Sequence, residues 1–285
     1  MPMERATKKA IRRFAIAGVV LFLGLVFLPL LTIFYLGCGL IDVMRNKRRD
    51  AMVFRKYFLG NGITTWLLSP LNLFVDLISY RNKGVYKHDD LPPEWREEVD
   101  QVLNVFREQK DTILTEIDES FEEGRRGMYV YEWYGKRKEH SVEALKRDYK
   151  YVKTIAVSVF SGKESTSFHY GPLRMTLRVL YNLTPVDTDQ VYIQCGWEKH
   201  FWRDDPLYIF DDTLIHRSVN DYDARRFVVF MDIMRPTAHP VFLDKLIAGV
   251  SVLVERANAV FYKNWKMLRP GAKSTEPPAP HSEAA

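Results

Sequence analysis

The stretch that decides the fold begins FHYGPLRMTLR at residues 168–178 and ends FDDTLIHRSVNDYDARR at residues 210–226. Two histidines in it, His169 and His216, stand 47 residues apart. A lone histidine is more often a core or surface residue than a metal ligand, but each of these two carries its own local pattern. Two imidazoles with open positions beside them suit a redox-active first-row metal. The stretch therefore predicts a metal site built on His169 and His216.

Each histidine is followed by an arginine, Arg178 nine residues after the first and Arg226 ten residues after the second. A guanidinium fork binds a carboxylate through two parallel hydrogen bonds, so two fixed arginines suit a dicarboxylate. Three further cations, Arg174, Arg217 and Arg225, stand close to the motif. Solvated surface charge is their default interpretation, and contact with a substrate phosphate is the alternative.

The chain around the motif has the pattern of short strands separated by turn residues. Five segments are rich in β-branched and aromatic side chains, at residues 151–160, 175–183, 191–198, 206–210 and 226–234. Glycine, proline, serine and aspartate fill the gaps between them. Many short strands with such punctuation indicate a β-sandwich or jelly roll. We therefore predict a mainly β fold.

The pattern H-x-G-P, then L-R, then F-D-D, then H and R, resembles the aspartyl/asparaginyl β-hydroxylase family over roughly residues 150–237. The resemblance implies a double-stranded β-helix (jelly roll) and an enzyme that depends on Fe(II), 2-oxoglutarate and O2. With its apolar N-terminus, the chain looks more like the branch that hydroxylates lipid acyl chains, such as lipid A hydroxylases, than the branch that acts on protein side chains.

By this resemblance, His169 and His216 are the metal ligands and 2-oxoglutarate fills two further positions. The wider superfamily places a carboxylate ligand two residues after the first histidine, where this chain and the family have glycine, here Gly171. Asp212, four residues before His216, is the expected catalytic residue that holds a metal-bound water. Structuring the turn before His216 is an alternative role of equal weight.

The resemblance also implies which residues surround 2-oxoglutarate. Arg226 is expected to pair with its distal carboxylate, and Ser158, eleven residues before His169, is expected to lie beside that carboxylate. Arg178 is expected near the carboxylate bound to the metal. The family has a further histidine two residues after that arginine, but this chain has Leu180. This part of the keto-acid site therefore departs from the family pattern.

Composition points to a membrane surface rather than to nucleic acid. The net charge is +5, the sequence pI is about 9.0, and much of the excess lies beside the N-terminal apolar run. Such a location favours anionic lipid as the partner. The two cysteines, Cys38 and Cys195, have no nearby cysteine, so no disulfide framework or zinc site is indicated.

Residues 14–41 form a run of 28 residues without a charge. The run is long enough to span a bilayer and too long for a cleaved signal peptide, so we predict an N-terminal membrane helix as the anchor within residues 1–56. Pro29 marks the place for a kink or a re-entrant hairpin. Five basic residues precede the run and six follow it, so the positive-inside rule favours a cytoplasmic C-terminal flank by one charge only.

The rest of the chain divides into three parts. Residues 57–92 are expected to be a membrane-proximal amphipathic segment and linker, because polar residues and proline interrupt the apolar stretch at 58–79. Residues 93–268 are expected to be the oxygenase domain, with a helix from Pro93. A helical period over 240–268 predicts a helix that either packs on the barrel or lies at the membrane surface. Residues 269–285 have a disordered composition.

The preferred function is hydroxylation of an acyl chain of a membrane lipid, lipid A first and an ornithine-type lipid second. Two alternatives stay open, a protein aspartyl/asparaginyl hydroxylase and a membrane-anchored jelly-roll binding module without activity. The expected partners are the lipid bilayer and its lipid, and not nucleic acid; the sequence does not determine the oligomeric state. Because Fe(II) and 2-oxoglutarate are cytoplasmic supplies, the catalytic domain is expected to face the cytoplasm from the inner (cytoplasmic) membrane.

Overall fold

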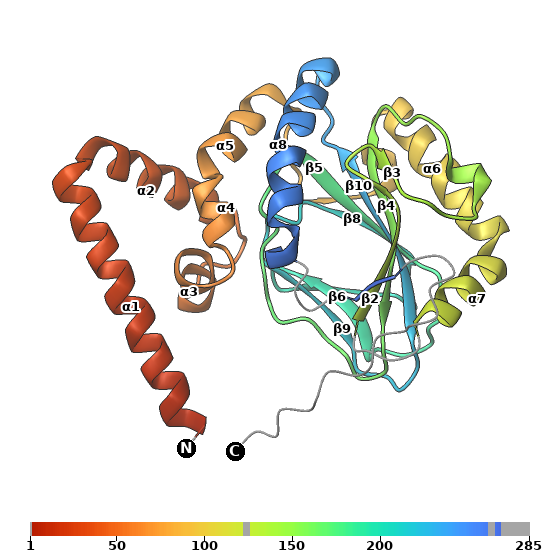
Figure 1. Cartoon of the computed structure of the whole chain (residues 1–285), viewed down its shortest axis with the longest axis horizontal. Coiled ribbons are helices and arrows are strands. Elements are labelled where there is room, and N and C mark those ends of the chain that lie inside the picture. Colours follow the sequence, from red (N-terminus) through yellow and green to blue (C-terminus); the bar gives the residue numbers. More distant parts are fainter. Residues whose placement is uncertain (1, 122–125, 262–265, 269–285) are drawn as a thin grey trace.

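The chain forms two facing, mostly antiparallel sheets in a computed structural model, which describes residues 2–121, 126–261 and 266–268 (Figure 1). The larger sheet runs, in spatial order, through β1 (Val85–Tyr86), β8 (Leu207–Phe210), β5 (Thr176–Asn182), β10 (Arg226–Met234), β4 (Val152–Phe160), β2 (Arg126–Trp133) and β11 (Lys266–Leu268), with β3 (Lys136–Arg137) beside β2. The smaller sheet contains β7 (Glu198–Phe201), β6 (Val191–Cys195) and β9 (His216–Asn220). The prediction of a mainly β fold with flanking helices is confirmed.

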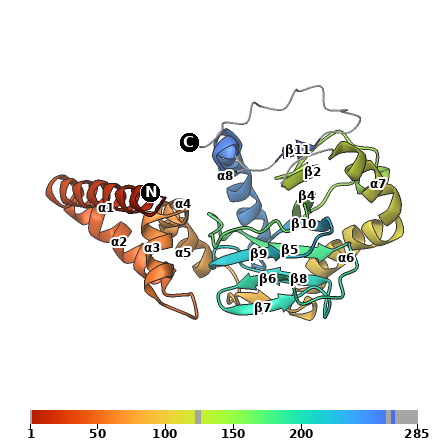
Figure 2. The same cartoon turned by 90° about the horizontal axis from the view of Figure 1, so that it is seen from below.

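The middle strands of the larger sheet, β4 and β10, are buried along their whole length. One face of the sheet packs against the smaller sheet, and the other is covered by α6 (Pro93–Glu108), α7 (Lys110–Ser120) and α8 (Pro240–Phe261) (Figure 2). Pro93 occupies the first turn of α6, where its missing N–H costs nothing. Trp95 of α6 donates a hydrogen bond from Nε1 to the Met234 carbonyl at 2.7 Å and so fixes the helix on β10.

Two segments differ from the sequence prediction. The helix expected over 240–268 ends at Phe261, and Lys266–Leu268 instead form a strand parallel to β2. β2 itself lies in a charged, tyrosine-rich region, 122–150, to which the sequence assigned no element; it is buried because β4 and β11 flank it. Two short 3-10 turns complete the domain, His88–Asp90 and Glu143–Leu145. Residues 269–285, with their disordered composition, lie outside the described residues.

The N-terminal apolar run is two helices rather than one. α1 (Pro2–Phe27) ends and α2 (Pro29–Val43) begins at Leu28, whose backbone is pulled out of the helical region because a proline follows it. Figure 1 shows the chain turning sharply there, so that α2 leads back toward α4 and α5. Among the described residues, no helix combines the length and the hydrophobicity that crossing a bilayer requires. The single membrane helix expected from the sequence is therefore not found.

Three short helices, α3 (Ala51–Leu59), α4 (Ile63–Leu67) and α5 (Ser69–Ile78), connect α2 to the sheets. They pack on the segments that carry the two histidines: Val43, Val53 and Tyr57 form one buried cluster with Tyr170 and Ile215. Both of the latter are the immediate neighbours of a histidine. The apolar stretch at 58–79 thus includes helices that contact the motif.

A buried ion-pair cluster fastens this contact. Arg174 is fully buried and pairs with Asp42 of α2, with Asp76 of α5 at 2.6 Å, and with Asp211 at 3.6 Å. Arg45 adds a second cation, 2.7 Å from Asp211. The solvated role taken as the default for Arg174 is wrong. We refer to these five residues as the Arg174 cluster.

Candidate metal and carboxylate site

The two motif histidines lie side by side. His169 and His216 form an antiparallel bridge, with N–H···O distances of 2.9 and 3.0 Å, and their ring centroids are 4.2 Å apart. Each Nδ1 lies 2.8 Å from the backbone carbonyl two residues earlier, of Ser167 and Leu214 respectively. A carbonyl can only accept, so Nδ1 carries the proton in both rings. Both Nε2 atoms therefore keep a free lone pair, as metal ligands require.

The electrostatic setting also keeps these rings neutral. Desolvation inside the barrel lowers the pKa of His169 to about 4, and desolvation and the neighbouring His169 lower the pKa of His216. A metal ion binds neutral imidazole, so the site does not have to lose a proton before it is loaded near pH 7.

Gly171 stands where the wider superfamily has a carboxylate, and the structure gives a physical reason. The Gly171 amide donates to the Asp212 carbonyl at 2.7 Å, and a Cβ on Gly171 would lie 2.3 Å from the Asp212 carboxyl carbon. Any other residue would collide with this carboxyl group. The carboxyl group beside the His169 segment is thus that of Asp212, which lies in the connection between β8 and β9.

Arg178 holds the Asp212 carboxyl in place. Its guanidinium lies 2.9 Å from Asp212 and 2.7 Å from Asp232, and it covers the Phe230 ring at 3.8 Å. Burial nevertheless raises the pKa of Asp212 to about 7, although Arg178 opposes the shift. Arg178 lines the same cavity as the histidines. Its expected place beside a metal-bound carboxylate stays a prediction, because two protein carboxylates already engage it.

Arg226 presents a buried cation without a counter-ion. It is 2 % exposed, and only Nη2 has a partner, the Ser218 hydroxyl at 2.6 Å. Its Nε and Nη1 are buried and unpaired, and no carboxylate among the described residues pairs with it. Burial lowers its pKa to about 9, so it is still charged at neutral pH. A buried, unpaired charge is costly, and an anionic ligand would remove that cost.

Ser158 lies on β4 directly opposite Val228, and its hydroxyl donates to the Val228 carbonyl at 3.2 Å. It lines one cavity together with Arg226, Arg178 and both histidines. All predicted site residues except Asp212 therefore line a single cavity between the sheets, and Asp212 pairs with one of its lining residues. Leu180, at the position of the family's further histidine, is an apolar part of the same wall.

Sequence reasoning missed the partners of these residues. Ser218 contacts Arg226, and Asp232 lies opposite Arg178 in the β5–β10 register. A serine two residues after His216 on an alternating strand was the available signal for the first. In the described part of the chain, no group of three or more His, Cys, Asp or Glu side chains could hold a metal.

Known proteins resemble this chain to different degrees. A family model for aspartyl/asparaginyl beta-hydroxylase matches residues 93–236. The ornithine lipid ester-linked acyl 2-hydroxylase of Rhizobium tropici is 24% identical over 222 residues, covering 71% of this chain and 76% of that protein.

Solved cupin structures overlap only loosely. A cupin domain from Bordetella pertussis has a TM-score of 0.24 and 17% identity, over 31% of this chain and 86% of that one. A cupin superfamily protein from Desulfitobacterium hafniense has a TM-score of 0.23 and 15% identity, over 31% and 72%. Neither overlap is close enough to bear on function. The family model, by contrast, matches half of the chain and includes both histidines and Arg226. The chain belongs to the aspartyl/asparaginyl β-hydroxylase family.

Proposed function

We propose that this protein is an Fe(II)- and 2-oxoglutarate-dependent dioxygenase that hydroxylates an acyl chain of a membrane lipid. The observation that carries the proposal is the cavity with two free imidazole nitrogens and one buried arginine lacking a counter-ion. Two neutral imidazoles with open positions suit Fe(II), and an unpaired guanidinium suits a carboxylate. When bound, the iron and 2-oxoglutarate supply the oxygen-activating chemistry, because no side chain can.

The residues of this chain then have separate tasks. His169 and His216 would hold the metal through Nε2, with each ring fixed by its carbonyl partner. Arg226, supported by Ser218, would bind the distal carboxylate of 2-oxoglutarate, with Ser158 beside it. The apolar lining, which includes Leu180 and Phe230, excludes water from the reacting centre.

Two observations support a lipid as the acceptor. The relative from Rhizobium tropici acts on the ester-linked acyl chain of ornithine lipid, and this similarity favours an amino-acid-containing lipid over lipid A. Large apolar side chains are also exposed along α1 and α2, among them Phe14, Val19, Val20, Phe22, Phe27, Leu30, Leu31, Ile33 and Phe34. Contiguous exposed apolar surface of this kind marks a protein or membrane contact.

We infer that α1 and α2 insert in the bilayer as a hairpin and do not cross it. Their apolar faces would lie among acyl chains, while basic residues flank both ends of the pair. The Arg174 cluster and the Tyr57–Tyr170 contact then hold the catalytic cavity at the membrane surface. Since the cosubstrates are supplied in the cytoplasm, we place the protein on the cytoplasmic side of the inner membrane.

Mass spectrometry of total lipids tests the proposal. Cells that express the full chain should accumulate a lipid with one added oxygen on an acyl chain, and cells that express His216→Ala should not. A chain lacking residues 2–27 should lose most of this lipid product but keep 2-oxoglutarate turnover in detergent, because the hairpin raises the local concentration of lipid. Added oxygen on a protein Asp or Asn, with unchanged lipids, would instead establish the protein-hydroxylase alternative.

An isosteric substitution distinguishes the two roles considered for Asp212, holding a metal-bound water and structuring the turn before His216. Asp212→Asn keeps the shape that packs on Gly171 but removes the charge paired with Arg178. If Asp212 holds a metal-bound water, turnover of 2-oxoglutarate should fall about 10–100-fold, as for other residues that orient a metal site from behind the ligands. Wild-type turnover with a lowered melting temperature would show that the residue only structures the turn.

A further inference from the structure

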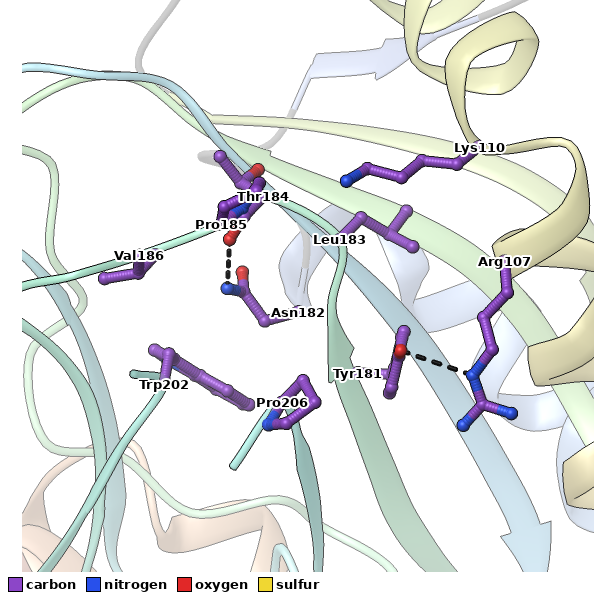
Figure 3. Close-up of a pocket in the computed structure, with 10 residues that line it drawn as sticks. All are labelled: Arg107, Lys110, Tyr181, Asn182, Leu183, Thr184, Pro185, Val186, Trp202 and Pro206. Atoms are coloured by element: carbon purple, nitrogen blue, oxygen red, sulfur yellow. Dashed lines mark hydrogen bonds between the residues drawn. The ribbon is translucent and has the colours of Figure 1, made fainter. Parts of the chain in front are cut away.

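A second hollow, about 260 Å³ in volume, lies outside the histidine cavity where α6 meets α7 (Figure 3). We call it the basic groove; it includes Arg107, Lys110, Tyr181, Asn182, Thr184 and Trp202. Arg107 and Lys110 are the only charged side chains in its lining, and neither is ion-paired to any described residue. The hydrogen-bond partners of Arg107 among the described residues are neutral groups: it donates to the Tyr181 hydroxyl at 3.3 Å and to Asn104 Oδ1 at 2.8 Å. The groove therefore favours anions.

Two buried polar atoms in the lining also lack partners. Asn182 is 7% exposed and Trp202 is 3% exposed, and neither the Asn182 Oδ1 nor the Trp202 Nε1 has a hydrogen-bond partner among the described residues. Buried polar groups are normally satisfied. The Trp202 N–H needs an acceptor, which a carboxylate supplies, and Asn182 Oδ1 needs a donor, which a water that accompanies the anion supplies.

Trp202 connects this groove to the histidine cavity. Its ring lines the groove and also lies 5.6 Å from Arg226 Cζ. Backbone hydrogen bonds also join the lining of the groove to β10. The Leu183 amide donates to the Phe227 carbonyl, and the Phe227 amide donates to Thr184 Oγ1, both at 2.9 Å. Asn182 lies opposite Val228, which lines the histidine cavity. The Trp202 ring thus borders the basic groove on one side and the unpaired guanidinium of Arg226 on the other.

The groove lies on the opposite side of the sheets from the apolar hairpin. Figures 1 and 2 show α6 and α7 on one side and α1 to α5 on the other. A lipid delivered from the hairpin side would therefore approach the cavity from the end where Tyr170 and Ile215 pack with residues of α2 and α3. A water-soluble anion has free access to the groove.

We propose that the basic groove is the entrance for 2-oxoglutarate: Arg107 and Lys110 attract the dicarboxylate, which passes Trp202 to reach Arg226. This inference rests on the proposed function. Cations around a cleft raise the association rate of an anion by about 10- to 1000-fold, whereas the dissociation rate depends on the final site. The two substrates would then enter from opposite sides, so that 2-oxoglutarate can exchange while a lipid is bound.

The test measures binding rather than turnover. The full chain in detergent is loaded with Fe(II) without oxygen, and 2-oxoglutarate binding is followed by stopped-flow tryptophan fluorescence and by calorimetry. In the double variant Arg107→Glu/Lys110→Glu, the association rate constant should fall about tenfold or more, with an unchanged dissociation rate constant. Trp202→Leu should raise both rate constants together, because it shortens the side chain in the passage.

The matched control is Arg49→Glu/Arg55→Glu, which makes the same change in net charge at exposed sites on the hairpin side, where neither arginine is ion-paired to a described residue. Its association rate constant should stay near that of the wild type. Three results would contradict the proposed entrance. The association rate constant could fall equally in both double variants, it could stay unchanged in the groove variant, or both rate constants could stay unchanged in Trp202→Leu. Absence of any 2-oxoglutarate binding to the wild-type chain would instead refute the proposed function.

Discussion

His216→Ala is expected to abolish Fe(II) binding and 2-oxoglutarate turnover while the chain stays folded. The Nε2 of His216 is one of two nitrogens available to the metal, and loss of a direct ligand should exceed the 10–100-fold effects seen for outer partners. The structural cost is the hydrogen bond to the Leu214 carbonyl, worth about 1 kcal/mol, together with the packing of the buried ring on His169 and Phe210. Calorimetric titration with Fe(II) without oxygen, together with circular dichroism, separates the two effects.

His200→Ala is the matched control. His200 lies on β7 in the same sheet, its Nε2 is 2.8 Å from the Asp205 carbonyl, and it does not line the histidine cavity. It should therefore keep Fe(II) affinity and turnover. Equal Fe(II) affinity in His216→Ala and the wild type would show that this pair of histidines does not bind the metal.

Arg226→Met is expected to have two effects of opposite sign. It should weaken 2-oxoglutarate binding by about 2–5 kcal/mol, or about 30-fold to a few thousand-fold, because the carboxylate loses a buried bidentate partner. It should also stabilise the chain without 2-oxoglutarate, by up to about 4 kcal/mol, because an unpaired buried cation is replaced by an apolar side chain of similar size. Calorimetry measures the first effect, and thermal unfolding with and without 2-oxoglutarate measures the second. Arg226→Lys, which keeps the charge but loses the fork, should still weaken binding.

Arg235 offers the comparison that makes this result interpretable. It is as buried as Arg226, but it pairs with Asp76 and donates to the Tyr80 carbonyl at 3.0 Å. Arg235→Met should therefore destabilise the chain, by about 1–3 kcal/mol, since it leaves the partly buried Asp76 carboxylate without one of its cations and the Tyr80 carbonyl without its donor. If Arg226→Met destabilises the ligand-free chain as much, Arg226 is structural and the dicarboxylate binds elsewhere.

The site residues could be found from the sequence because each carries a local signal. His169, His216 and Arg226 lie within short motifs at fixed spacings, and alternation along β4 and β10 puts Ser158 and Arg226 on the cavity side. Long-range pairing has no such signal. Arg174 looked like surface charge because its partners Asp42 and Asp76 lie 132 and 98 residues earlier, on helices expected to be anchor and linker.

The remaining errors in the predicted fold also arise because pairing between distant segments leaves no local signal. The break at Leu28 was signalled by Pro29, but a pattern of hydrophobicity does not distinguish a kinked span from two helices. β2 was hidden by its charged flanks, because its burial depends on β4 and β11 beside it rather than on its own period. The β11 strand likewise exists only through pairing with β2, which no local pattern encodes.

The Arg174 cluster decides where a shortened, self-sufficient version of this protein can begin. Residues 93–236, which match the family model, contain Arg174 and Asp211 but neither Asp42 nor Asp76. Cutting at Pro93 would leave one buried guanidinium facing a single aspartate and would strip Tyr170 and Ile215, beside the two histidines, of their apolar cover. The smallest autonomous folding unit therefore starts before Asp42, although it can dispense with α1. The helices that we propose to contact the membrane and the strands that we propose to hold the metal are consequently joined through one common core.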